Sequence, residues 1–353
     1  MLKFLPVVAM AIAGFTAPTV MVAQAASFDC AKASTPFEHA ICDNPELSRA
    51  DERLSKTYET AIGGLSKAAL DAVRADQRIW LDYAQKACTS DAKPMAKGSY
   101  SENGVSCLVD IFSSRSQVLE TSRMMDGRRF YPQSRYAALP DPYEADDPDS
   151  NWPVAQHEQT LVQLDSSEPY AVAFNEFVRK QGEVELGMFA AQGGEGDGQD
   201  DDTSNTDNKI TVQEQAGTGR ISLAVNTYWY GHGAAHGNYS LSYLHYLVDE
   251  KRGLEATDMF TGKGWEKKLT ALTLAALQAE HGDNLMLDDN SNVVALVAVH
   301  PTRWDFSDDY GLLIQFEPYE VSAYAYGAPT ARVSWTDLEP YLSEKADKIR
   351  YGY

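Results

Sequence analysis

The distribution of cysteines is the feature that most constrains how this chain folds. All four, Cys30, Cys42, Cys88 and Cys107, lie in the first third of the 353 residues. An even number of cysteines in an exported segment is typical of disulfides. Three pairings are available, and we favour Cys30 with Cys42 and Cys88 with Cys107, because each closes a short loop between neighbouring helices. A four-thiolate zinc site is the alternative, but the spacings contain no Cys-x-x-Cys pair, so we expect no metal.

The first 25 residues predict export. Lys3 is the only charge before the uncharged stretch 4–22, and Ala23-Gln24-Ala25 has the small-x-small form that signal peptidase requires. We place the cleavage after Ala25 and expect a signal peptide over residues 1–25. No later segment is long and apolar enough to cross a bilayer, so we expect no membrane span in the mature protein. The predicted location is periplasmic or secreted.

The charge of the chain restricts its partners. Lys and Arg number 30 against 51 for Asp and Glu, which gives a formal net charge of -21. Such a field repels the phosphate backbone that dominates nucleic-acid affinity, so we expect no nucleic-acid binding. The same field attracts a basic partner.

Hydrophobic periodicity divides the chain into three parts after the leader. Residues 26–125 carry apolar positions at three- and four-residue spacing and predict a helical domain. Residues 126–152 are rich in Pro, Asp and Tyr without a period, and we interpret them as a linker. Residues 153–353 mix both periods, with strands expected at 221–230 and 239–248. The predicted fold class is α+β: a small disulfide-stapled all-α N-terminal domain followed by an α+β domain with a mostly antiparallel sheet.

The densest chemical feature lies between those two strands. The segment 230–238 contains three glycines together with Tyr230, His232, His236 and Asn238. It could present these groups to a ligand, or it could be a Gly-rich turn whose histidines cap backbone groups. A metal site on the two histidines is a third reading, but the glycines argue against the helix that would align them. A second aromatic cluster consists of Tyr319, Tyr324 and Tyr326, which could stack on sugars, anchor a protein partner or pack in the core.

No catalytic arrangement is recognisable. The chain lacks a Gly-x-Ser-x-Gly elbow, a phosphate-binding Gly-x-x-x-x-Gly-Lys and a dinucleotide fingerprint. We therefore expect a binding protein rather than an enzyme, with no catalytic residue and no cofactor. The predicted binding residues are Tyr230, His232, His236, Asn238, Tyr319, Tyr324 and Tyr326.

The first domain resembles the LprI-type lysozyme-inhibitor family of bacterial envelope proteins. The matching positions are Phe28-Asp29-Cys30, Ala33, Glu38, Ile41-Cys42, Leu47, Asp51, Leu54, Tyr58, Gln77-Arg78-x-Trp80-Leu81, Cys88, Cys107-Leu108 and Arg115. They cover nearly all of residues 28–120. The resemblance implies the same two sequential disulfides.

The second domain resembles the extracellular domain shared by the lysozyme-sensing anti-sigma factor RsiV and the peptidoglycan deacetylase PdaC. The match rests on Ala173-Phe174-Asn175, Ile221-Ser222-Leu223, the segment 230–238, Asp258-Met259-Phe260, Gly311-Leu312, Phe316-Glu317-Pro318-Tyr319-Glu320-Val321 and Tyr324-Ala325-Tyr326-Gly327. It spans most of residues 155–345. Since neither a sigma-binding segment nor a deacetylase domain accompanies it here, the resemblance implies neither signalling nor deacetylation.

Together the two resemblances imply an exported envelope protein that binds, and can inhibit, lysozyme-type muramidases. The expected partner is a lysozyme-type basic protein, with peptidoglycan as a further partner. Two alternatives remain: a module that binds peptidoglycan or another carbohydrate through exposed aromatic rings, and a metal-dependent hydrolase that uses His232 and His236.

Overall fold

The computed structural model describes residues 26–145, 150–151, 153–185, 201–287 and 292–353. The signal peptide predicted over residues 1–25 lies outside them. Within these ranges no helix is both long and apolar enough to cross a membrane.

The N-terminal part is helical, as predicted. Local capping sets the helix starts: Thr35 and Glu38 form a capping box, and the side chain of Asn44 accepts hydrogen bonds from the first turn of the second helix. Both expected disulfides are present, Cys30–Cys42 and Cys88–Cys107, each with its Cα atoms 5.7 Å apart. The helices are α1 Pro36–Asp43, α2 Pro45–Ile62, α3 Lys67–Ala87 and α4 Glu102–Glu120.

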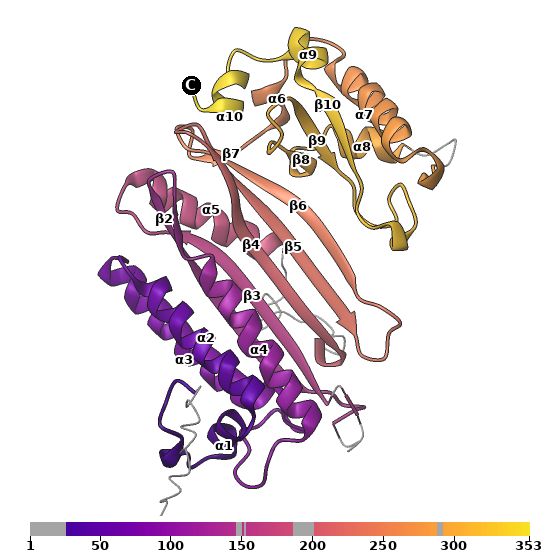
Figure 1. The fold of residues 1–353 in the computed structure, drawn as a ribbon. Helices are drawn as coiled ribbons and strands as arrows, with labels where there is room; N and C mark the ends of the chain where they lie inside the picture. Colours follow the sequence, from indigo (N-terminus) through magenta and orange to yellow (C-terminus); the bar gives the residue numbers. More distant parts are fainter. Residues whose placement is uncertain (1–25, 146–149, 152, 186–200, 288–291) are drawn as a thin grey trace, which may run out of the picture.

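A seven-stranded sheet forms the centre of the molecule, with its strands in chain order (Figure 1). The strands are β1 Arg123–Met125, β2 Arg128–Pro140, β3 Val154–Leu164, β4 Ser204–Ala216, β5 Arg220–Gly231, β6 Asn238–Leu247 and β7 Arg252–Gly253. All neighbours are antiparallel except β3 and β4, which run parallel and are joined through helix α5, Pro169–Glu185. The fold is therefore α+β with a mostly antiparallel sheet, as expected.

The linker predicted over residues 126–152 was wrong in its first half, because β2 occupies it and pairs with β3 along its whole length. Proline is disfavoured inside a strand, and β2 contains Pro132 and Pro140. Pro132 is tolerated because β1 pairs only with 128–130 and leaves the outer edge of β2 free beyond that point. A signal for the strand was present: Asp126-Gly127, both with positive φ, is the two-residue turn typical of a hairpin.

The two faces of the sheet are covered by different helices. On one face α5 buries Phe174 and Val178 against aliphatic side chains of β4, β5 and β6. On the other face the helical domain packs over β2 and β3, where the ring of Tyr83 stacks on that of Tyr136 at 5.0 Å. Figure 1 shows α3 and α4 lying along these strands.

A buried ion pair fixes the helical domain to the sheet. The Nη2 atom of Arg115 lies 2.9 Å from Oδ2 of Asp76, and Nη1 donates to the hydroxyl of Tyr136 at 2.8 Å. The other carboxylate oxygen of Asp76 accepts the backbone N–H of Ser134 in β2 at 3.1 Å. Both charged side chains are almost fully buried. One pair of charges thus joins α3, α4 and β2.

The C-terminal part forms a smaller unit with its own core around Trp304 and Phe316. Strands β8 and β9 pair as an antiparallel hairpin, and β10 completes a three-stranded sheet. The elements are α6 Ala256–Met259, α7 Trp265–His281, α8 Val293–Ala298, β8 Trp304–Asp305, β9 Gly311–Gln315, β10 Thr330–Ser334, α9 Trp335–Leu338 and α10 Ala346–Tyr351.

His245 of β6 connects this unit to the large sheet. Its ring nitrogens lie 2.8 Å from Oγ of Ser222 in β5 and 2.8 Å from the carbonyl oxygen of Trp304 in β8. Burial, reinforced by the charge of Arg220, lowers the pKa of His245 from 6.5 to about 3. The imidazole is therefore neutral in the folded protein at any pH well above that value.

We predict that stability falls as pH drops from about 6.5 towards 3, partly because of His245. The unfolded chain takes up a proton on this imidazole in that range and the folded chain does not. The free energy of unfolding, measured by denaturant titration at several pH values, should decrease less steeply with falling pH in His245→Gln than in the native chain. An unchanged slope would show that another group controls the acid response.

Removing Arg115 should destabilise the protein strongly, because it leaves the buried carboxyl group of Asp76 without its cationic partner. For Arg115→Met we expect a loss of about 3–5 kcal/mol in the free energy of unfolding, and partial recovery when Asp76→Leu is added. The matched control is Asp71→Asn, which breaks the exposed pair with Lys67 and should cost at most about 1 kcal/mol. Equal losses in Arg115→Met and the control would contradict a structural role for the buried pair.

Candidate functional site

The β5–β6 hairpin carries the predicted segment 230–238 at its tip. Tyr228 pairs with Tyr239, and Trp229 pairs with Asn238, so the turn itself lies beyond these pairs. Gly237 lies so close to the ring of Tyr228 that a Cβ atom on it would be about 2.5 Å from the hydroxyl, and the ring would have to shift. The glycine lets the hairpin fold closely over that ring.

His232 is buried and has partners on both sides of its ring. Its side chain is 3% exposed, Nδ1 lies 2.6 Å from Oδ2 of Asp141, and Nε2 lies 3.1 Å from Oδ1 of Asn205. Asp141 directly follows β2, and Asn205 lies in β4. His232 therefore fastens the hairpin to two other strands and does not face solvent.

His236 has the opposite environment. It is exposed, and its ring stacks on that of Tyr324 at 4.2 Å. The hydroxyl of Tyr324 donates to the carbonyl oxygen of Gly237, which holds the two loops together. The two histidines thus belong to different environments. Among the residues that the structure describes, no three His, Cys, Asp or Glu side chains gather as a metal site.

The predicted tyrosines meet His236 in an aromatic cluster that we define as His236, Tyr239, Tyr319 and Tyr324. Ring centroids of Tyr324 lie 5.3 Å from Tyr319 and 6.0 Å from Tyr239. The side chain of Tyr319 is 63% exposed. Its backbone has φ +70°, a conformation that costs a non-glycine residue about 1–3 kcal/mol and that the surrounding structure must therefore hold in place. The cluster therefore presents ring surface that is held in place yet open to solvent.

The remaining predicted residues lie at the edges of this cluster. Tyr326 is exposed, and its hydroxyl lies 2.9 Å from Nδ1 of His281 on α7. Tyr230 donates its hydroxyl to the carbonyl oxygen of Ala234 within the turn at 3.1 Å, and Asn238 is exposed at the start of β6. The structure thus brings the tyrosines of the C-terminal unit to the hairpin, and separates His232 from them.

Sequence reasoning missed a pocket of about 320 Å³ between the helical domain and the sheet. Its walls are Tyr83 of α3, three residues of α4 (Asp110, Ile111 and Ser114), and a row of side chains across the sheet. The pairing of β3 with β4 places Glu158 beside Asp207, and the register of β4 with β5 places Asp207 opposite Tyr228. The pocket was missed because this row joins strands that are far apart in sequence. Single carboxylates also carry little information about function in so acidic a chain.

Glu158 is a perturbed carboxyl group in the wall of this pocket. Its carboxylate oxygens accept hydrogen bonds from the hydroxyls of Tyr83 at 3.2 Å and Ser114 at 3.1 Å. Burial, together with the neighbouring charge of Asp207, raises the pKa of Glu158. Perturbed carboxylates in a cleft are typical of functional sites, although structural networks also produce them.

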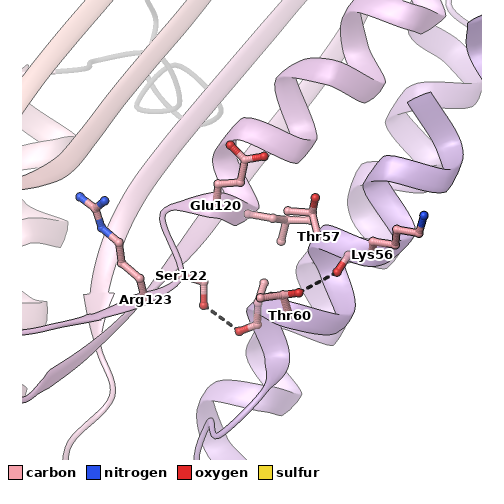
Figure 2. A pocket seen from close by; sticks show the side chains of 8 residues that line it. Lys56, Thr57, Thr60, Glu120, Ser122 and Arg123 are labelled. Carbon is pink, nitrogen blue, oxygen red and sulfur yellow. Dashed lines mark hydrogen bonds between the residues drawn. The ribbon is translucent and has the colours of Figure 1, made fainter. Parts of the chain in front are cut away.

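A second cavity, of about 370 Å³, lies between α2 and the end of α4 (Figure 2). The hydroxyl groups that line it form hydrogen bonds within the chain. Ser122 donates to the carbonyl oxygen of Ala61 at 2.7 Å, and Thr60 donates to the carbonyl oxygen of Lys56 at 2.9 Å. Glu120 is paired with Arg53 at 2.8 Å. These contacts explain the polar lining of the cavity without a ligand.

Comparison with known proteins gives two family matches and several similar solved structures, including two DUF3298 family proteins. No curated protein matches the chain. A DUF3298 family member from Bacteroides fragilis is 15% identical with a TM-score of 0.44, and covers 64% of this chain and 96% of its own. A DUF3298 family protein from Pseudomonas aeruginosa is 13% identical with a TM-score of 0.43, and covers 64% of this chain and 98% of its own.

The family matches confirm the resemblance of the N-terminal part and are consistent with that of the C-terminal part. The model described as "Lysozyme inhibitor LprI" matches residues 30–119, which include both disulfides. The model described as "Protein of unknown function (DUF3298)" matches residues 257–336, a shorter stretch than the resemblance suggested. The chain therefore carries an LprI domain at its N-terminus and a DUF3298 domain at its C-terminus.

Proposed function

We propose that this chain is an exported cell-envelope protein that binds and inhibits lysozyme-type muramidases. The observation that carries the proposal is the match of residues 30–119 to a lysozyme-inhibitor family over the whole disulfide-stapled domain. The two disulfides support an oxidising compartment outside the cytoplasm. We assign the protein no catalytic residue and no cofactor.

The charge of the chain supports a basic partner. Lysozymes of host origin are commonly basic, and a net charge of -21 favours association with them through long-range attraction. The effect acts on the rate of encounter more than on the strength of the final complex.

We place the contact surface at the aromatic cluster and its edges. Tyrosine supplies large contact area at low entropic cost and is enriched where protein interfaces concentrate their binding energy. A muramidase cleft works with two carboxyl groups, and the exposed phenols and the imidazole of His236 supply hydrogen-bond donors for them. In this proposal Tyr230 and Asn238 border the contact surface, while His232 supports it from below.

A module that binds peptidoglycan is the second candidate. The observation that favours it is the exposed side chain of Tyr319, whose ring is tilted against that of Tyr324, while Tyr324 stacks on His236. Such a group of rings is a platform suited to a sugar ring. Sedimentation of the mature protein with purified peptidoglycan, in the absence of lysozyme, distinguishes this candidate from the first.

The mature protein should form a complex with a basic lysozyme whose affinity falls as salt rises. Exposed charges are screened over about 8 Å at physiological ionic strength, so the electrostatic part of the attraction weakens steadily. The dissociation constant should be measured by calorimetry at several salt concentrations, with lysozyme activity followed in parallel. If no lysozyme binds even at low salt, the proposal fails and the carbohydrate candidate takes its place.

The two histidines should respond differently to substitution. His236→Ala should weaken partner binding by about 1–3 kcal/mol with little change in Tm, because the side chain is exposed in the contact surface. His232→Ala should lower Tm, because it leaves the buried carboxylate of Asp141 without its partner. Binding constants and melting curves of both variants test the assignment. Normal binding by His236→Ala would remove the aromatic cluster from the interface.

A further inference from the structure

The outer side of strand β6 is a sheet edge that the rest of the chain covers only in part. β7 pairs with Tyr246 and Leu247 alone, and no further described strand follows it in the sheet. Figure 1 shows β6 as the outermost long strand on this side of the sheet. Residues 238–242, towards the hairpin tip, are all at least partly exposed, whereas Tyr243 is buried. We call residues 238–242 the open edge.

The pairing of β6 determines which of its backbone groups point out of the sheet. The N–H of Leu254 donates to the carbonyl oxygen of His245 at 2.8 Å, so the backbone polar groups of His245 point away from β5. Backbone groups alternate in direction from one strand residue to the next, and β6 pairs with β5 without a bulge along its whole length. The N–H and C=O groups of Tyr239 and Leu241 therefore also point away from β5.

A contact of β5 supports this direction. Tyr228, which pairs with Tyr239, donates its backbone N–H to the side chain of Asn208 in β4 at 3.3 Å, and so away from β6. Within the described ranges of the chain, the N–H and C=O groups of Tyr239 and Leu241 have no hydrogen-bond partner. The open edge thus offers two backbone donors and two acceptors in a row, with about 7 Å between the two residues.

The open edge lacks the features by which proteins protect a sheet edge. Edge strands are usually blocked by charged side chains, proline, bulges or a very short length. The open edge reads Asn-Tyr-Ser-Leu-Ser and has neither a charge nor a proline. The opposite edge of the sheet is protected, because β1 has only three residues and starts with Arg123, and β2 behind it contains Pro132. An unprotected edge is a template for pairing with another chain.

We propose that the open edge of β6 accepts an extended segment of a bound basic protein as an added strand. The backbone of that segment pairs with the outward N–H and C=O groups of Tyr239 and Leu241. Its side chains on one face of the sheet lie beside the ring of Tyr239, where cross-strand contacts with an aromatic residue are favourable. This inference rests on the proposed function and describes how its partner is held.

Charge and position favour this occupant over a second copy of the chain. A second copy would bring another net charge of -21 to the edge, whereas a basic protein is attracted to it. Tyr239 belongs both to the open edge and to the aromatic cluster. The hydroxyl of Tyr324, in the same cluster, donates to the carbonyl oxygen of Gly237 directly before the strand. A protein seated on the aromatic cluster therefore lies against the open edge.

Amide exchange tests the edge residue by residue in the free protein. Followed by NMR in the mature chain, the amides of Tyr239 and Leu241 should exchange with solvent faster than those of Ser240 and Ser242, whose N–H groups point to β5. Protection of Tyr239 and Leu241 in the free chain, as a monomer or as a dimer, would show that the edge is already covered and would overturn the proposal.

A basic lysozyme should then protect the outward amides. In the complex, the exchange of Tyr239 and Leu241 should slow at least about tenfold, with Ser240 and Ser242 as the internal reference. If lysozyme binds and leaves the exchange of Tyr239 and Leu241 unchanged, this inference is overturned while the proposed function stands.

Two variants of Leu241 separate its N–H group from its side chain. Leu241→Pro removes the outward N–H without breaking a bond to β5, and proline is tolerated at a sheet edge. Leu241→Ala shortens the side chain and keeps the N–H. We expect Leu241→Pro to bind lysozyme at least about tenfold more weakly than Leu241→Ala, with melting curves to verify that both are folded. Equal binding by the two folded variants would contradict the added strand, and if Leu241→Pro does not fold, amide exchange in the native chain decides.

A peptide probe decides the case in which no lysozyme binds the native chain and the proposed function fails. The probe is the basic peptide Lys-Thr-Val-Thr-Val-Thr-Lys with blocked ends, and its control carries N-methyl groups on the five central residues, which prevent strand pairing on either side. Slower exchange of Tyr239 and Leu241 with the first peptide alone would support the open edge as a site for basic extended chains. Slower exchange with neither peptide, or equally with both, would overturn the inference.

Discussion

The ion pair between Arg115 and Asp76 determines how the molecule is put together. It joins two helices of the LprI domain to strand β2, so the position of α4 over the sheet depends on it. Ser114, the residue before Arg115, and Ile111, one turn earlier, form one wall of the pocket that contains Glu158. Buried pairs of this kind contribute little net stability compared with apolar packing, but they fix an arrangement because the unpaired alternatives are costly.

Much of the fold could be predicted from local signals. The disulfides followed from the short loops they close, the helix starts from capping residues such as Thr35 and Asn44, and β5 and β6 from alternating apolar positions. Strand β2 was missed because its inward residues Ser134 and Tyr136 are polar or aromatic, so the apolar alternation is absent. They serve a polar contact with Arg115, which no pattern within residues 128–140 reveals.

The candidate site shows the same limit more sharply. His232 and His236 are four residues apart in a Gly-rich turn, and nothing in that turn distinguishes them. Their environments differ because Asp141, 91 residues earlier, comes to one and Tyr324, far later, comes to the other. The pocket was equally hidden, since Glu158, Asp207 and Tyr228 lie on three strands and become neighbours only through the register of the sheet. At such a site the sequence identifies which residue types are present. The topology of the fold determines which of them contact one another.

The direct connection from α4 into β1 and β2 has a consequence for how such a protein can arise. The first family match ends at residue 119 and the second begins at residue 257, and the whole seven-stranded sheet lies between these limits. A gene fusion cut at residue 119 would leave Tyr83 without the ring of Tyr136 and Asp76 without its contact to β2. A gene segment that preserves the packing of the helical domain on the sheet must therefore extend beyond the LprI domain. It must also encode strand β2.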